Sequence, residues 1–321
     1  MRNWKILIPL LGVIALAGCG SSSSTNTNSV KASAVPPAGS SSSTTPSSSA
    51  PSSGSTSTPA AVASVEALVP SSIKSKGTLT VAADASYAPD EFIAPDGHTV
   101  IGMDADLSTA LAAVMGLKAN VVNATFDSII PGLAAGKYDM GASSFTDTKA
   151  REKQVDFVDY ANVGESFYTK SSGGATISTI SDICGKTVSV EKSTTEETDA
   201  QTQSAACKKA GKPGVAVLSF PDQNGANLAV SSGRAQLGFA DTPPAAYQVK
   251  KSNGLFKLIG APYAPAPYGL AFPKQPGLAK AALAAMKALE SDGSYSAIFA
   301  KWGLQGIAIP ASKVQMNGAT S

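Results

Sequence analysis

Histidine and cysteine, the residues that most often bind zinc, are scarce in this sequence. The 321 residues include one histidine, His98, and three cysteines, Cys19, Cys184 and Cys207. No two cysteines have a C-x-x-C spacing, and His98 follows Pro-Asp-Gly, a pattern typical of an exposed hairpin turn. We therefore expect neither a metal site nor a cofactor.

An excess of positive charge is also missing. The sequence contains 25 basic and 23 acidic residues. Residues 1–18 contain Arg2 and Lys5 and no acidic residue, so their removal lowers the basic count from 25 to 23 and balances the charge. A protein that binds nucleic acid or anionic lipid through charge needs a basic face, and the balanced charge argues against both.

The sequence has no apolar run long enough to stay in a membrane. Ile6–Ala15 falls short of the roughly 20 apolar residues of a permanent span. With Arg2 and Lys5 before it, this run is typical of a secretory signal peptide at residues 1–18. It ends in Leu16-Ala-Gly-Cys19, which resembles a bacterial lipobox. We expect a lipid anchor at Cys19 and a location on the outer face of the cell membrane, the alternative being an ordinary signal peptide with a chance cysteine.

Residues 19–64 have too little apolar content for a folded domain. Ser, Thr, Pro, Ala and Gly make up almost all of residues 20–62, a composition that predicts a disordered linker after the lipid anchor. Such a linker should span about 35–40 Å on average. Because an exported protein meets an oxidising environment, we expect the two remaining cysteines, Cys184 and Cys207, to form a disulfide.

From Thr78 onward, predicted strands and helices alternate. Strands are expected at 78–83, 118–122, 138–142, 187–190, 215–220 and 236–240, with a hairpin at 91–101. Helices are expected at 107–115, 129–135, 195–209, 223–231, 278–289 and 295–302, with Pro131 in the first turn of its helix. This alternation predicts an α/β fold with parallel sheets, and ligands of such folds bind at the carboxyl ends of the strands.

Polar segments directly follow three of these strands, at residues 84–89, 143–151 and 193–197. Ser and Thr at such junctions leave backbone N–H groups free for a carboxylate, which Arg151 could bind as well. Asp241 follows the strand at 236–240 and could accept from an ammonium group. The pattern favours an amino-acid pocket, although the same residue types also serve as plain helix caps.

A series of short motifs extends over the globular part in a fixed order. They are Asp84-Ala-Ser-Tyr-Ala-Pro, Gly102-Met-Asp-Ala-Asp-Leu, Phe126-Asp-Ser-Ile-Ile-Pro-Gly-Leu, Gly136-Lys-Tyr-Asp, Thr146 to Arg151 with Val155-Asp-Phe, Cys184-Gly-Lys-Thr-Val-Ser-Val, Gly238-Phe-Ala-Asp241, and Gly293-Ser-Tyr-Ser-Ala-Ile-Phe-Ala-Lys-Trp-Gly303. With these motifs the sequence resembles the family 3 bacterial solute-binding proteins, the extracellular amino-acid receptors of ABC importers.

The resemblance implies the two-lobed α/β fold of periplasmic binding proteins. Each lobe would be a mostly parallel sheet flanked by helices, and two extended hinge strands near Gly164 and Pro267 would join the lobes. Lobe one would comprise residues 66–163 and 268–321, and lobe two residues 164–267. Hinges at these positions would let the lobes close on a ligand.

The resemblance also implies which residues bind the ends of an amino acid. Arg151 would bind the α-carboxylate, together with backbone N–H groups at Thr146 and Thr195. Asp241 would bind the α-ammonium group, together with Ser144 and the Thr146 hydroxyl.

Four further residues would contact the ligand side chain by the same resemblance. Tyr87 and Phe126 would pack on its two faces. Asp84 and Asp104 would meet its polar end, although Asp104 could instead be the N-cap of the helix after it.

Two positions depart from the family pattern, and both add negative charge. Asp90 stands where an aromatic residue usually follows Tyr-x-Pro, and Glu191 stands where an apolar residue is common. Acidic residues near the pocket favour a basic amino acid, such as arginine, lysine, ornithine or histidine, over glutamate.

The resemblance thus implies a monomer that captures a free polar L-amino acid and delivers it to the permease subunits of an ABC importer, without catalysis. The sequence leaves two alternative functions open. One is an amino-acid sensor that acts through a separate membrane partner. The other is a cyclohexadienyl dehydratase-type enzyme on the same fold, with Glu191 or Asp90 as its general acid.

Overall fold

The structure is a computed structural model that describes residues 58–274 and 277–320. The described residues all belong to one compact unit. The expected signal peptide, the lipidation of Cys19 and most of the expected linker lie outside the described residues. None of the helices in the described part is long and apolar enough to cross a membrane.

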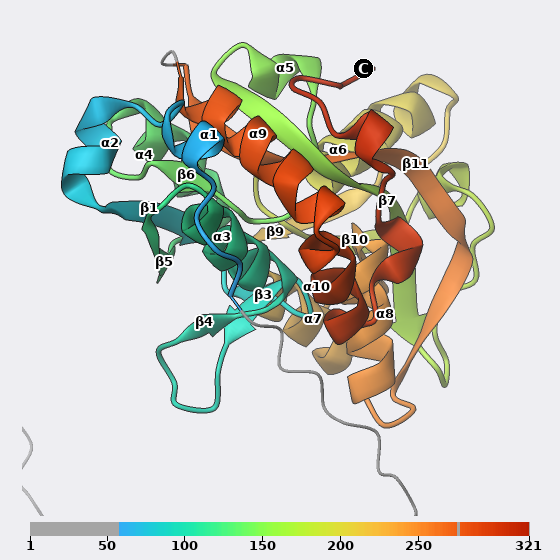
Figure 1. Ribbon diagram of the computed structural model, residues 1–321. Coiled ribbons are helices and arrows are strands. Elements are labelled where there is room, and N and C mark those ends of the chain that lie inside the picture. Colours follow the sequence, from blue (N-terminus) through green and yellow to red (C-terminus); the bar gives the residue numbers. More distant parts are fainter. Residues whose placement is uncertain (1–57, 275–276, 321) are drawn as a thin grey trace, which may run out of the picture. The chain divides into compact units, whose positions relative to one another are not determined.

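One eight-stranded sheet runs through the compact unit, in the order β5-β1-β6-β11-β7-β10-β8-β9 (Figure 1). Its strands are β1 (Thr78–Ala83), β5 (Lys118–Asn123), β6 (Met140–Gly141), β7 (Val155–Lys170), β8 (Thr187–Glu191), β9 (Ala216–Phe220), β10 (Leu237–Asp241) and β11 (Phe256–Pro273). The long strands β7 and β11 are antiparallel partners. Parallel pairs lie on both sides of them, β1 with β5 and β6 on one side and β8 with β9 and β10 on the other.

Helices surround this sheet, and a small second sheet forms the predicted hairpin. The helices are α1 (Ala63–Glu66), α2 (Ser71–Lys76), α3 (Met103–Val114), α4 (Phe126–Ala134), α5 (Lys149–Glu152), α6 (Thr195–Lys209), α7 (Gln223–Ser232), α8 (Thr242–Lys251), α9 (Leu278–Ser291) and α10 (Ser294–Trp302). The small sheet contains β2 (Ser86–Tyr87), β3 (Glu91–Ile93) and β4 (Val100–Ile101). The predicted α/β fold is confirmed, and β1 and α6 have the predicted bounds.

Helix α3 begins four residues before the predicted start. Its N-cap is Gly102, whose φ of 134° is rare for residues with a side chain. A Cβ at Gly102 would lie 2.2 Å from the carbonyl oxygen of Asp90, so only glycine permits this close approach. Asp104 is the second residue of the helix, so the alternative prediction that Asp104 is the N-cap is wrong.

Helix α4 also begins earlier than predicted, at Phe126, which places Pro131 in the helix interior and not in its first turn. The Phe126 N–H donates to Asp84 Oδ2 at 2.9 Å. Because a carboxylate from a distant segment satisfies this N–H, the helix can start without a local side-chain cap. Helix α8, whose sequence starts Thr-Pro-Pro, was not predicted.

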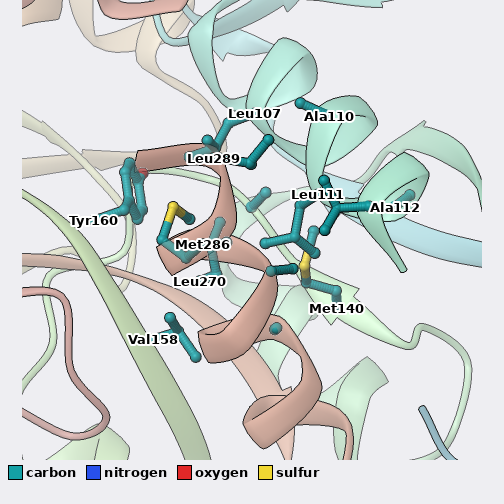
Figure 2. Packing of buried hydrophobic residues seen from close by; sticks show 14 of the residues in the cluster. Leu107, Ala110, Leu111, Ala112, Met140, Val158, Tyr160, Leu270, Met286 and Leu289 are labelled. Atoms are coloured by element: carbon teal, nitrogen blue, oxygen red, sulfur yellow. The ribbon is translucent and has the colours of Figure 1, made fainter. Parts of the chain in front are cut away.

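The largest apolar cluster packs α3 and α9 against the sheet. Figure 2 shows Leu107 and Leu111 of α3 near Met286 and Leu289 of α9. All four side chains are fully buried, and each contributes about 1.5–3 kcal/mol to folding. This cluster fixes the part of the sheet that contains β1, β6 and the first half of β7.

A separate cluster lies around β8 and β10. Phe167 of β7 and Phe239 of β10 stack there with ring centroids 3.9 Å apart. The Cys184–Cys207 disulfide borders the same cluster, with the two Cα atoms 5.7 Å apart. The predicted disulfide is confirmed.

Candidate functional site

A cavity lies at the carboxyl ends of the parallel strands that flank the β7 and β11 pair on either side. Asp84 follows β1, Ser144 follows β6, and Glu191 and Asp241 end β8 and β10. This is where α/β folds bind ligands. The lining residues are Asp84, Tyr87, Glu91, Phe126, Ser143, Ser144, Thr146, Arg151, Glu191, Thr194, Thr195, Glu196 and Asp241.

The cavity brings together nine of the eleven residues predicted to contact a ligand. Asp90 and Asp104 are not in its wall, although both are fully buried. Four lining residues were not predicted: Glu91, Ser143, Thr194 and Glu196. Glu91 directly follows Asp90, and Glu196 lies in the polar segment at residues 193–197 that the sequence already indicated.

Arg151 is the cation of the cavity wall, and its neighbours hold it firmly. Its Nη1–H donates to the Thr146 carbonyl at 2.8 Å, and its Nη2–H donates to the Ser193 carbonyl at 3.0 Å. The guanidinium also lies over Phe126, 5.2 Å from the ring centroid, and Phe126 stacks on Phe145 at 4.6 Å. Phe126 therefore packs against Arg151 as well as facing the cavity.

Ser144 of the cavity wall and Ser193, whose carbonyl accepts from Arg151, both have a left-handed backbone conformation. Ser144 has φ 47° and Ser193 has φ 66°, values uncommon for residues other than glycine. The Ser144 N–H donates to Asp104 Oδ2 at 2.8 Å, and the Ser193 N–H donates to Glu197 Oε2 at 2.7 Å. Carboxylates thus hold both strained turns in place, and such strain concentrates at functional sites.

Asp241 is tied to Tyr87 by two hydrogen bonds that cross the cavity. The Tyr87 hydroxyl donates to Asp241 Oδ2 and accepts from the Asp241 N–H, each at 3.0 Å. Burial raises the pKa of Asp241 to about 6, while the nearby Tyr268 hydroxyl, the hydrogen bond from Tyr87 and the charge of Arg151 lower it. Asp241 is therefore available as an anion at neutral pH.

The rest of the wall is strongly acidic. Glu191 and Asp84 face each other, and burial followed by the charge of Asp84 raises the pKa of Glu191 well above its usual range. Burial followed by the charge of Asp241 does the same to the pKa of Glu196. Burial, Asp104 and Asp90 raise the pKa of Glu91. These groups would ionise more readily if a cation entered the cavity.

Asp90 and Asp104 lie together behind this wall. The Asp104 N–H donates to the Asp90 carbonyl at 2.9 Å, a contact that follows from the close approach at Gly102. Burial, then the charges of Asp104 and Asp241, raises the pKa of Asp90 well above its usual range. Asp104 supports the Ser144 turn and Asp90 is buried next to Glu91, so neither side chain lines the cavity.

Several contacts join the two sides of the cavity besides the Tyr87–Asp241 pair. Lys192 Nζ forms an ion pair with Asp127 at 2.8 Å, and the Gln223 N–H donates to Ser86 Oγ at 3.0 Å. Within the described ranges, no group of three or more His, Cys, Asp or Glu side chains is arranged to bind a metal ion.

Known proteins are similar to this chain in both sequence and fold. The chain is 36% identical to the arginine-binding protein ArgT of Corynebacterium glutamicum over 77% of this chain and 81% of that one. It is 31% identical to the ABC transporter glutamine-binding protein GlnH of Bacillus subtilis over 65% of this chain and 74% of that one.

Solved structures of two-lobed amino-acid-binding proteins superpose on the fold. An ancestral arginine-binding protein bound to arginine matches with a TM-score of 0.65 and 33% identity, over 70% of this chain and 98% of that one. An ancestral amino-acid-binding protein, a precursor of cyclohexadienyl dehydratase, matches with a TM-score of 0.63 and 32% identity, over 72% of this chain and 97% of that one. Residues 79–305 match the family described as bacterial extracellular solute-binding proteins, family 3, and the chain belongs to that family.

Proposed function

We propose that this protein captures a basic L-amino acid, with arginine preferred, and delivers it to the permease subunits of an ABC importer. The number of carboxyl groups in the cavity wall is the observation that carries this proposal. Five carboxyl groups and one guanidinium line the wall. The carboxylate and ammonium groups common to all amino acids would pair with Arg151 and Asp241, and the acidic remainder then selects a cationic side chain.

In this proposal the ends of the ligand are bound by groups that the cavity already orients. Arg151 binds the α-carboxylate with backbone N–H groups at Thr146 and Thr195, which supply charge-assisted hydrogen bonds. Asp241 binds the α-ammonium group with Ser144 and the Thr146 hydroxyl. The two hydrogen bonds between Tyr87 and Asp241 support this role, because they fix the carboxylate before the ligand arrives.

The ligand side chain would extend toward Asp84 and Glu191. These two carboxyl groups face each other across the wall, and a guanidinium between them would replace a shared proton by a cation. Phe126 and Tyr87 would pack on the aliphatic stem. Asp90 would lie behind the wall without touching the ligand.

We further propose the lobe boundaries expected from the family: residues 66–163 with 268–321, and residues 164–267. The pairing of β7 with β11 supports hinges near Gly164 and Pro267, because its register shifts between Ile259 and Tyr263 and again between Tyr263 and Ala266. A ladder interrupted in this way bends more readily than a regular one.

Anchoring through lipid on Cys19, on the outer face of the cell membrane, remains part of the proposal, as does a monomeric state. Cys19→Ala should leave the protein unprocessed or released from the membrane. A variant that still fractionates with membranes as a mature lipoprotein would exclude this anchor. Size-exclusion chromatography of the mature protein tests the monomer.

The proposed function includes no reaction. Arg151 and Asp241 together suit a whole amino acid, and the dehydratase-related structure is itself described as an amino-acid-binding precursor. Incubation with prephenate or arogenate should yield no aromatic product. Formation of phenylpyruvate or phenylalanine would instead make Glu191 a candidate general acid.

Calorimetry with arginine and citrulline tests the proposed ligand class. Citrulline has the length and shape of arginine but carries a neutral urea group in place of the guanidinium. We expect arginine to bind at least about 30-fold more tightly, since charge-assisted hydrogen bonds are roughly twice as strong as neutral ones. Equal binding of citrulline, or stabilisation by glutamate alone, would overturn the proposal.

A further inference from the structure

The C-terminal segment beyond the family match folds back onto the part of β7 that precedes the proposed hinge at Gly164. The match ends at residue 305, and residues 314–319, the C-terminal strap, lie along β7. Met316 forms an antiparallel bridge with β7, and the Phe157 N–H donates to Asn317 Oδ1 at 2.8 Å. Figure 1 shows this red segment ending beside α5, the short helix that carries Arg151.

Two buried carboxyl groups connect the strap to the loop that leads into α5. Asp147 belongs to that loop and Asp159 to β7, and each is 1% exposed. Asp147 Oδ2 accepts from the Ala319 N–H at 3.2 Å, and Asp159 Oδ2 accepts from the Gly318 N–H at 3.1 Å. The Oδ1 atom of each carboxyl group is buried and, with both groups ionised, finds no partner among the described residues. One proton shared between the two groups satisfies both oxygens.

The position of Asp147 determines where Arg151 can lie. Asp147 directly follows Thr146, whose carbonyl accepts from Arg151 Nη1–H at 2.8 Å. The Asp147 N–H donates to the Pro267 carbonyl at 2.8 Å, so both the backbone and the side chain of Asp147 are fixed. A binding group keeps its geometry only when the residues behind it are held, and here the strap holds them.

We propose that the Asp147–Asp159 pair and the C-terminal strap position the Arg151 loop for ligand binding. Asp147 and Asp159 are positioning residues that touch no ligand. The inference rests on the proposed function for its affinity readout only, since the order of the loop can be measured without any ligand.

The charged groups around the pair determine how it responds to pH. Burial, followed by the charge of Asp147, raises the pKa of Asp159 to about 8. Lys149 and Glu152 of α5 also face the pair, while Asp156 of β7 is paired with Lys274 and the strap itself carries no charged side chain. Because this folded pKa lies above the unfolded value, the pair stabilises the loop at low pH and loses that effect as pH rises through about 8.

Two kinds of variant separate the pair from the strap. Asp159→Asn keeps a donor toward Asp147 and cannot ionise, whereas Asp159→Ala removes the contact. Gly318→Ala should displace the strap, because a Cβ at Gly318 would lie 2.1 Å from Asp159 Oδ2. Gly306→Ala is the matched control, since a Cβ at Gly306 meets nothing within 4 Å.

Hydrogen exchange of residues 144–151 and arginine affinity from pH 6.5 to 8.5 give the readouts. Asp159→Ala and Gly318→Ala should exchange faster and bind arginine about tenfold more weakly at pH 7, whereas Gly306→Ala should match the wild type. The wild-type affinity should fall above pH 8, and that of Asp159→Asn should stay level.

Unchanged exchange and affinity in Asp159→Ala would overturn the proposal, as would the same alkaline decline in Asp159→Asn and the wild type. If Gly318→Ala does not fold, the two Asp159 variants decide alone. If the wild type binds no arginine, the proposed ligand class fails, while the exchange data still test the strap.

Discussion

The hydroxyl of Tyr87 offers a sharp test of how the cavity prepares Asp241. Tyr87→Phe removes two hydrogen bonds of 3.0 Å, one to the Asp241 carboxylate and one from its N–H. The ring is 6% exposed, so water replaces these bonds poorly. A hydrogen bond to a charged group contributes about 1.5–3 kcal/mol. Because the ligand ammonium recovers part of this, we expect the lower end, a loss of affinity of roughly tenfold.

The same substitution should change the pH dependence of binding. Asp241 must be ionised to bind an ammonium group, so affinity should fall as pH drops through its pKa of about 6. The Tyr87 hydrogen bond lowers this pKa, and its loss raises the pKa. The acidic midpoint of binding should therefore move toward neutral pH in Tyr87→Phe.

Calorimetry with arginine between pH 5.5 and 8 measures both effects. Tyr138→Phe is a suitable control, because Tyr138 is a buried tyrosine in a different apolar cluster. An affinity of Tyr87→Phe within twofold of the wild type, with an unchanged acidic midpoint, would refute the reasoning. It would mean that the two hydrogen bonds do not persist in the bound state.

The disulfide, Glu191 and the ion pair of Asp127 with Lys192 each give a further prediction. Replacing Cys184 and Cys207 by serine should lower the free energy of unfolding by about 3 kcal/mol, measured by denaturant titration, because the disulfide closes a loop with a sequence separation of 23; an unchanged midpoint would contradict this. Glu191→Gln should weaken arginine binding about tenfold and citrulline binding much less, and an equal loss for both ligands would remove Glu191 from charge selection. Asp127→Ala breaks the exposed ion pair with Lys192 and should change affinity less than about threefold, so a larger loss would show that this contact controls closure.

Local patterns predicted much of the fold and the outline of the site. The bounds of β1 and α6 follow from apolar alternation and from the N-cap Thr194, whose side chain accepts from the Glu197 N–H. Ligands of α/β folds bind at the carboxyl ends of parallel strands. Because Arg151 and Asp241 both follow such strands in the sequence, both were predicted to lie at one cavity.

The errors arise where contacts between distant segments decide. Nothing local shows that Asp84 supplies the cap for α4, so the position of Pro131 was misjudged. Asp90 departs from the family pattern, but its neighbour Glu91 is the residue that lines the cavity. Successive side chains along a strand point to opposite faces, so an error of one residue reverses the predicted direction of a side chain. Sequence patterns rarely fix the bounds of a strand to within one residue.

The strands β7 and β11 also bear on how the protein unfolds. They pair from Lys170 and Phe256 at one end to Val155 and Pro273 at the other, so the apolar clusters on both sides depend on the same two strands. Loss of either cluster would leave the ladder without support, which favours one cooperative transition over two separate ones. A ligand bound between the two sides would then raise the melting temperature of the whole unit, so that a single thermal curve reports binding.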